Sequence, residues 1–184
     1  MVLGYTVEFS DYTGKFKQWL DEPFAAVSKR GVTEIFFYHL QQQPLDRVLP
    51  KLLQQAFDRG WRTVVQASTP ERVEALSTLL WTHDDEGFLP HGTTSDGLGE
   101  MQPIWLTDGD DAPNGATVRF FVDGASPAGV EGLSRAVIIF DGGDETAVQA
   151  ARQSWTNFHS QGCEVTYWQQ DESGRWQNRA ARPA

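Results

Sequence analysis

The chain of 184 residues contains a single cysteine, Cys163, so no disulfide can form within it. This usage is compatible with a reducing compartment. No apolar run approaches the roughly 18 residues that a membrane-spanning helix needs. Residues 1–30 also lack the continuous apolar core of a signal peptide. From these absences we expect a cytoplasmic protein with no membrane association.

Basic residues are outnumbered, with 15 Lys and Arg against 25 Asp and Glu and a formal net charge of −10. Strong nucleic-acid binding needs clustered cations that contact phosphates. We therefore expect no strong direct binding to DNA or RNA. The chain is rich in tryptophan instead, with seven residues, and aromatic side chains dominate both cores and protein interfaces.

The motifs that bind nucleotides or carry nucleophiles are missing as well. The phosphate-binding pattern Gly-x4-Gly-Lys-Ser/Thr is absent, and no Gly-x-Gly-x-x-Gly follows the first predicted strand. That strand runs into Leu40-Gln41-Gln42-Gln43-Pro44, whose side chains would obstruct a cofactor phosphate. No Gly-x-Ser-x-Gly elbow occurs either. We expect no catalytic site and no cofactor.

Two acidic segments resemble functional motifs only in part. Residues Gly142-Gly143-Asp144-Glu145 are similar to the signature of cyclic-dinucleotide synthases, but they fall between a predicted strand and a predicted helix. Two glycines and an Asp cap suit such a turn in any case. Asp84-Asp85-Glu86 would hold a hard cation only if further oxygen ligands converged, and a solvated loop is the simpler interpretation.

The histidines give no sign of a metal site. They show no ligand spacing to one another or to Cys163. His39 ends a predicted strand and is expected in the core, whereas His159 is expected on a helix face near the negative end of the helix dipole. The four are His39, His83, His91 and His159.

Hydrophobic periodicity predicts alternating strands and helices. Strands are expected near 34–39, 61–67, 103–107, 118–122, 135–140 and 164–169, and helices from 45 to 57, 70 to 80 and 144 to 158. Ser68 or Thr69 should cap the second helix, and Gly60 and Gly162 should end the first and third. Asn114-Gly115 is a turn signal of the hairpin kind between two short strands. The order predicts an α/β sandwich with a largely parallel sheet.

Three regions are expected along the chain. Residues 32–178 read as one self-contained α/β domain, and 179–184 as a frayed tail. Residues 1–31 carry aromatic side chains without clean periodicity. They are interpreted either as a docking arm or as an extension that results from an upstream start codon. The segment 82–102 is expected to be a long irregular loop.

Five segments in order along the chain carry a family resemblance. They are Ile35-Phe36-Phe37-Tyr38-His39-Leu40, Leu80-Trp81, Phe88-Leu89-Pro90-His91-Gly92, Pro103-Ile104-Trp105-Leu106 and the helix with Ala151-Arg152-x-x-Trp155. Together they resemble the chi subunit family of bacterial DNA polymerase III holoenzyme, over about residues 32–178. The resemblance implies a Rossmann-like, three-layer fold without a nucleotide. It also implies a non-catalytic clamp-loader accessory, which binds the psi subunit on one surface and the C-terminal tail of single-stranded DNA-binding protein on another.

That tail is an acidic peptide ending in Pro-Phe, and it needs an apolar slot for the ring and a cation for the carboxylate. The resemblance implies Arg152 as the cation, with Trp81 and Trp155 beside the ring. Arg152 and Trp155, at i and i+3, would be neighbours on one helix face. Thr156 stands where some relatives have a second basic residue, which His159 or Arg62 would replace. The alternative is that Trp155 belongs to the core and Arg152 is merely solvated.

By the same resemblance, Phe88, Leu89, Pro90 and His91 are the candidates for binding psi or the clamp loader. Alternatively, Phe88 and Leu89 fold back over the edge of the sheet. Two other functions are kept open. One is a small α/β nucleotide-binding protein or enzyme with the 82–102 loop as a lid, and the other is a generic interaction module with a different partner.

Overall fold

The computed structural model describes residues 33–84 and 87–179. The expectations for residues 1–31, for residues 180–184, and for Asp85 and Glu86 therefore lie outside the described residues. The strands are β1 (Glu34–Leu40), β2 (Thr63–Gln66), β3 (His91–Gly92), β4 (Ile104–Thr107), β5 (Val118–Phe121), β6 (Arg135–Asp141), β7 (Glu164–Gln170) and β8 (Trp176–Asn178). The helices are α2 (Leu45–Asp58), α3 (Pro70–Thr82), α4 (Glu145–Ser160) and the short 3₁₀ helix η1 (Gly99–Met101).

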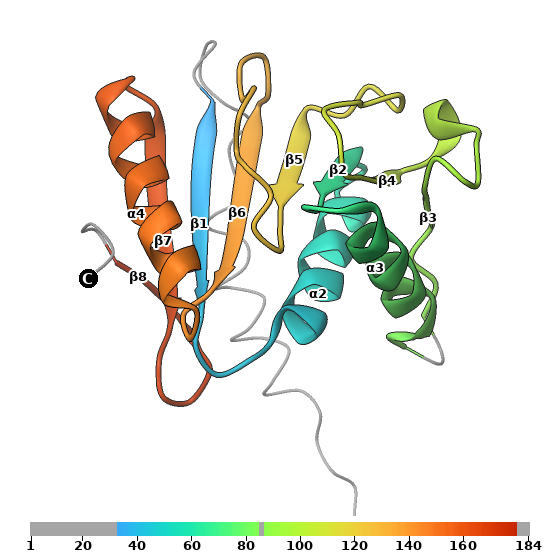
Figure 1. Ribbon diagram of the computed structural model, residues 1–184. Helices are drawn as coiled ribbons and strands as arrows, with labels where there is room; N and C mark the ends of the chain where they lie inside the picture. The colour runs from blue at the N-terminus through green and yellow to red at the C-terminus, as the bar shows by residue number, and fades with distance from the viewer. Residues whose placement is uncertain (1–32, 85–86, 180–184) are drawn as a thin grey trace, which may run out of the picture. The chain divides into compact units, whose positions relative to one another are not determined.

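The strands form one sheet in the order β3-β4-β2-β5-β6-β1-β7-β8 (Figure 1). Every neighbouring pair is parallel except β7 and β8. The connection from β1 through α2 to β2 and the connection from β6 through α4 to β7 run in opposite directions along the sheet. Because such crossovers are right-handed, α2 and α4 cover opposite faces. The predicted α/β sandwich with a largely parallel sheet is confirmed.

The α4 side of the sheet holds a continuous apolar core. Alternate residues of the central strands point to this face, as the period of two requires. Its buried members include Ile35, Phe37, Ile138, Phe140, Val148, Ala151, Phe158 and Tyr167. His39 is also buried, as expected, and its ring stacks on Phe140 with 4.9 Å between centroids.

The predicted helix ends are confirmed by their local chemistry. Thr69 caps α3, with its hydroxyl accepting from the backbone N–H of Arg72, and Pro70 is the first helical residue. Asp144 caps α4 by accepting from the N–H groups of Thr146 and Ala147, so the Gly-Gly-Asp-Glu segment is the turn between β6 and that helix. Gly60 and Gly162 follow α2 and α4 with φ of 73° and 77°, the left-handed region that ends helices at glycine.

The hairpin that Asn114-Gly115 suggested is wrong. Strands β4 and β5 do not pair, because β2 lies between them and is parallel to both. The turn itself exists, with Gly115 at φ 66°. The buried Asn114 amide donates to the carbonyls of Thr63 and Gln102 at 3.0 and 3.1 Å. The turn signal was therefore real, but it carries the chain across the end of β2.

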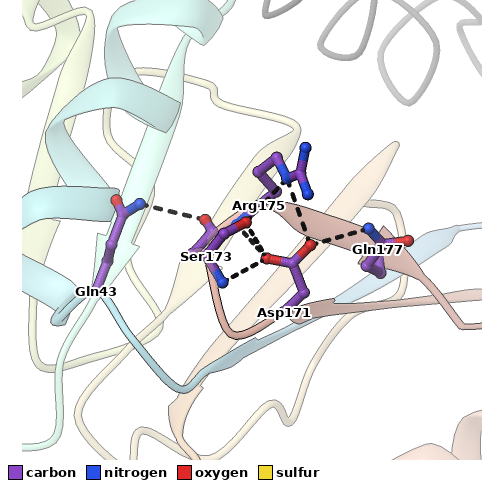
Figure 2. Close-up of polar contacts among 6 residues, drawn as sticks. Gln43, Asp171, Ser173, Arg175 and Gln177 are labelled. Atoms are coloured by element: carbon purple, nitrogen blue, oxygen red, sulfur yellow. Dashed lines mark hydrogen bonds and ion pairs between the residues drawn. The ribbon is translucent and has the colours of Figure 1, made fainter.

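The antiparallel turn between β7 and β8 is organised by one carboxylate. Asp171 accepts from the hydroxyl and N–H of Ser173, from the N–H of Arg175 and from the amide of Gln177 (Figure 2). These bonds, led by the Ser173 hydroxyl, hold the pKa of Asp171 well below its usual range. The amide of Gln43 donates to the carbonyl of Gly174, which ties this turn to the end of β1.

Asp171→Asn is expected to lower the urea concentration at the midpoint of unfolding at pH 7. The difference in midpoint between the variant and the wild type should be smaller at pH 3. A carboxylate whose pKa is lower in the folded state stabilises the fold above its unfolded pKa, about 3.9 for Asp, and loses that contribution as pH falls. Urea unfolding followed by tryptophan fluorescence at both pH values measures this. The neighbouring Glu172→Gln serves as the control, and an equal difference at both pH values would contradict the role of the charge.

No helix within the described ranges is long and apolar enough to cross a membrane.

Candidate functional site

Three side chains lie along one face of α4, namely Arg152, Trp155 and His159, which we call the α4 stripe. Their spacing of three and four residues places them one turn apart. The rings of Trp155 and His159 stack with 4.9 Å between centroids and 15° between planes. Trp155 is half-buried against the apolar core, whereas His159 is exposed. Trp155 is therefore both a core contact and a surface ring.

Arg152, the first residue of the α4 stripe along the helix, is half-buried. Its positive charge acts on Tyr167 and on His39, which lie under α4 and share a 2.6 Å hydrogen bond between Nδ1 and the phenol oxygen. Burial raises the pKa of Tyr167 to about 12, and Arg152 opposes that rise. Burial also lowers the pKa of His39, with Asp141 opposing and Arg152 adding to the effect. Both neighbours are thus neutral near pH 7, so neither adds a charge beside the Arg152 guanidinium.

The two candidates for a second basic contact lie in different places. Thr156, one residue after Trp155, donates its hydroxyl to the backbone carbonyl of Arg152. Arg62 donates to the carbonyls of Glu100 and Asn114, beside η1. His159 stacks on Trp155. Of the two, His159 is the one within the stripe.

Trp81 lies elsewhere, near the end of α3, with 59% of its surface exposed. Its ring centroid is 5.6 Å from that of Phe88 and 5.1 Å from that of His91. Helix α3 lies against β3 and β4, and α4 against β6 and β7, so the two helices are at opposite ends of the sheet (Figure 1). Strands three places apart are about 14 Å apart, and right-handed crossovers place α3 and α4 on opposite faces. The structure does not bring Trp81 to Arg152 and Trp155.

The segment after α3 divides into inward and outward residues. Phe88 is 63% exposed, whereas Leu89 and His91 are 1% and 7% exposed, and Pro90 is intermediate. The Nδ1–H of His91 donates to the carbonyl of Leu89 at 2.8 Å, and its Nε2 accepts from the hydroxyl of Ser77 at 3.3 Å. The buried Leu89 and His91 therefore hold the segment in place. For Leu89 this agrees with the alternative interpretation, in which the residue folds back over the edge of the sheet. Phe88 and Trp81 are left as an outward pair, which we call the Trp81–Phe88 surface.

At the carboxyl end of β1, where a nucleotide-binding fold holds phosphate, the backbone amides are already occupied. The N–H groups of Gln41, Gln42 and Gln43 all donate to Oε1 of Gln170, at 2.9, 3.0 and 3.1 Å. Gln170 is buried at the end of β7. Nothing in the sequence near residue 41 identifies this partner, which lies about 130 residues away. The register of β1 and β7 was needed to find it.

A cleft of about 1080 Å³ opens at the same edge of the sheet. Among the residues that line it are Gln41, Arg72, Phe121, Asp123, Phe140 and Asp144. No residue of the described part of 82–102 lines it, because that segment runs through β3 and η1 at the far end of the sheet. The alternative in which the 82–102 loop acts as a lid over a ligand therefore finds no lid at this cleft. No cluster of three or more His, Cys, Asp or Glu suited to a metal occurs among residues 33–84 and 87–179.

The chain is similar to known proteins over most of its length. Residues 32–166 match the family described as DNA polymerase III chi subunit, HolC. A protein of Rickettsia prowazekii (strain Madrid E), named "Probable DNA polymerase III subunit chi", is 27% identical over 85 residues, which are 46% of this chain. The chain spans about half the length of that curated relative, 52%. The family match includes the α4 stripe and the Trp81–Phe88 surface, and the chain belongs to the DNA polymerase III chi subunit family.

Proposed function

We propose that the protein is a non-catalytic replication accessory subunit that links the clamp loader to single-stranded DNA-binding protein. Family membership supports the accessory role in replication. The proposed contact with single-stranded DNA-binding protein is made by the α4 stripe, which binds the acidic Pro-Phe tail. The proposed contact with the psi subunit or the clamp loader is made by the Trp81–Phe88 surface.

The observation that supports the tail site is the order of chemistry along α4. A terminal Phe presents a carboxylate and an apolar ring a few ångströms apart. Arg152 offers a guanidinium that suits a carboxylate, and the half-buried Trp155 offers an apolar face one turn away. His159 stacks on Trp155 and extends the same face, and we assign it to the acidic residues that precede the Pro-Phe end. With a net charge of −10, the protein attracts an acidic tail poorly at long range, so binding is weak and salt-sensitive.

Trp81 is reassigned in this proposal from the tail site to the second surface. Its ring contacts are with Phe88 and His91, and two large exposed rings side by side are costly to leave in water. Leu89 and His91 position this surface from beneath and do not face a partner themselves. Pro90, half-buried, lies at its margin.

The nucleotide-binding alternative is less well supported. A phosphate at the end of β1 would need the three amides that Gln170 occupies. Displacing a buried side chain from three hydrogen bonds costs free energy that a ligand would have to replace.

Fluorescence anisotropy with a labelled peptide ending in Asp-Ile-Pro-Phe tests the tail site. We expect saturable binding on the order of micromolar, in the range of small transient interfaces. Arg152→Ala and amidation of the peptide's C-terminus should each weaken binding by about tenfold or more, because each removes one partner of a charge-assisted hydrogen bond.

Trp81→Ala is the matched control, since it removes an exposed tryptophan from the other surface. It should leave peptide affinity unchanged. Equal loss in Trp81→Ala and Arg152→Ala would contradict the separation of the two surfaces. Equal binding of the free acid and the amide would remove Arg152 from the role of carboxylate contact.

A further inference from the structure

A second pair of exposed apolar side chains lies at the two ends of η1, with Leu98 just before the helix and Met101 as its last residue, apart from the surfaces already assigned. Leu98 and Met101 are 66% and 68% exposed, the highest values among the large apolar residues that the structure describes as exposed. They are three residues apart, and the N–H of Met101 donates to the carbonyl of Leu98 at 2.9 Å. We call this pair the Leu98–Met101 patch.

The backbone at Leu98 is strained. Its φ of 50° and ψ of 38° lie in the left-handed region, directly after Gly97 at φ 69°. Among the described residues, the other non-glycine residue with positive φ is Asp123, a type that tolerates this region. A leucine there gains neither a favourable backbone nor burial, so folding alone does not explain its presence.

The patch is held outward by a rigid base. Arg62 donates to the carbonyl of Glu100 within η1. Gly99 lies so close to Pro113 that an added Cβ would be 2.5 Å from the proline Cγ, and Trp105 borders the same point. The indole N–H of Trp105 in turn donates to Asp111 at 2.6 Å. Since both sides of η1 are fixed, Leu98 and Met101 cannot fold back into the core without breaking these contacts.

The chain segment that carries the patch is acidic, and Asp96 and Glu100 are the carboxylates next to the patch in sequence. Residues 92–113 contain Asp96, Glu100, Asp108, Asp110 and Asp111, and no Lys or Arg. Hydrogen bonds from the N–H and the hydroxyl of Thr93 hold the pKa of Asp96 below its usual range, so it stays charged. The arginines that contact this segment, Arg62 and Arg119, donate to backbone carbonyls. This charge disfavours nucleic acid, an acidic tail and a second copy of the chain, and it favours a cationic partner.

We propose that the Leu98–Met101 patch binds a basic amphipathic helix of a partner protein. Such a helix offers an apolar stripe one or two side chains wide, flanked by Lys or Arg that would meet the carboxylates of Asp96 and Glu100 beside the patch. The contact is small, so it adds to a larger assembly as a weak and salt-sensitive interaction. The patch is separate from the α4 stripe. It would prefer a basic partner, whereas the α4 stripe is proposed to bind an acidic one.

The test is fluorescence anisotropy of the full chain with a labelled amphipathic helical peptide of leucine and lysine. A serine–lysine peptide of equal charge and a leucine–glutamate peptide are the matched probes. Leu98→Asn removes the apolar side chain and introduces a residue that tolerates left-handed φ. Because one buried side chain of this size accounts for about a tenfold change in affinity, Leu98→Asn and Met101→Gln should each weaken binding of the leucine–lysine peptide about tenfold. Glu172→Gln, at an exposed position in none of the proposed surfaces, should leave it unchanged.

Thermal unfolding separates this role from a structural one. Leu98→Asn should have a melting temperature equal to or above that of the wild type, because the strain is relieved. A melting temperature lower by several degrees would mean that Leu98 stabilises the fold, and the proposal would fall. It would also fall if the serine–lysine peptide bound equally well, if Leu98→Asn bound like the wild type, or if sedimentation showed a dimer that Leu98→Asn dissociates.

Discussion

Gln170→Leu is expected to lower the free energy of unfolding by about 3 kcal/mol. The Gln170 side-chain oxygen accepts from three consecutive N–H groups, those of Gln41, Gln42 and Gln43. Leucine has nearly the same volume and no acceptor, so the three amides would lose their partner together, and each partly buried donor left without one carries a desolvation cost. Urea unfolding followed by tryptophan fluorescence measures the loss.

Two further variants separate the hydrogen bonds from simple changes in polarity. Gln153→Leu makes the same change at an exposed position of α4 and should leave stability within about 0.5 kcal/mol of the wild type. Gln170→Glu keeps the acceptor and removes an amide nitrogen that has no partner among the described residues, so it should retain more stability than leucine. Equal losses in the leucine and glutamate variants would show that the three amides do not depend on the Gln170 oxygen.

Arg119→Met is expected to cost a similar amount, about 3 kcal/mol. Arg119 is 5% exposed on β5. It donates to the side chain of Gln66 and to the carbonyls of Gly109, Asp110 and Asp111, at 2.8 to 3.2 Å. Burial lowers its pKa, and Asp110 and Asp111 oppose that effect, so the charge is retained. Methionine keeps the length of the stem and removes every donor.

The comparison for Arg119 is Arg175→Met, because the Arg175 side chain is 79% exposed and its ion pair with Asp171 is 3.5 Å long. That change should cost little, as exposed ion pairs do. Chemical unfolding of both variants gives the difference. Hydrogen exchange in residues 108–111 should rise in Arg119→Met alone. Similar stability of the two variants would mean that the loop holds its shape without the buried guanidinium.

Local signals predicted most of the fold. The periodicity of apolar residues located the three helices, and Thr69, Asp144, Gly60 and Gly162 marked their ends because caps are set by neighbouring atoms. Contacts between residues that are far apart in the sequence could not be predicted in this way. The Asn114-Gly115 turn looked like a hairpin because its local chemistry is the same whether the next strand is a neighbour or lies beyond β2.

The candidate site was predictable where its residues share one helix. The spacing of Arg152, Trp155 and His159 is enough to place them together on α4. Trp81 is different, because its place relative to α4 depends on the order of the strands, which no local pattern encodes. The burial of Leu89 and His91 could not be predicted from the sequence either, since it depends on Ser77 and on the packing of α3 against the sheet.

The short outer strands bear on how partners are recognised. In the described part of the chain the sheet ends in β3, with two residues, and β8, with three. So short an edge exposes few main-chain donors and acceptors, and it offers little template for an added strand from another protein. Recognition through side chains that project from helices and turns therefore suits this sheet better than recognition along its edges. That mode lets each contact change by single substitutions while the sheet beneath stays the same.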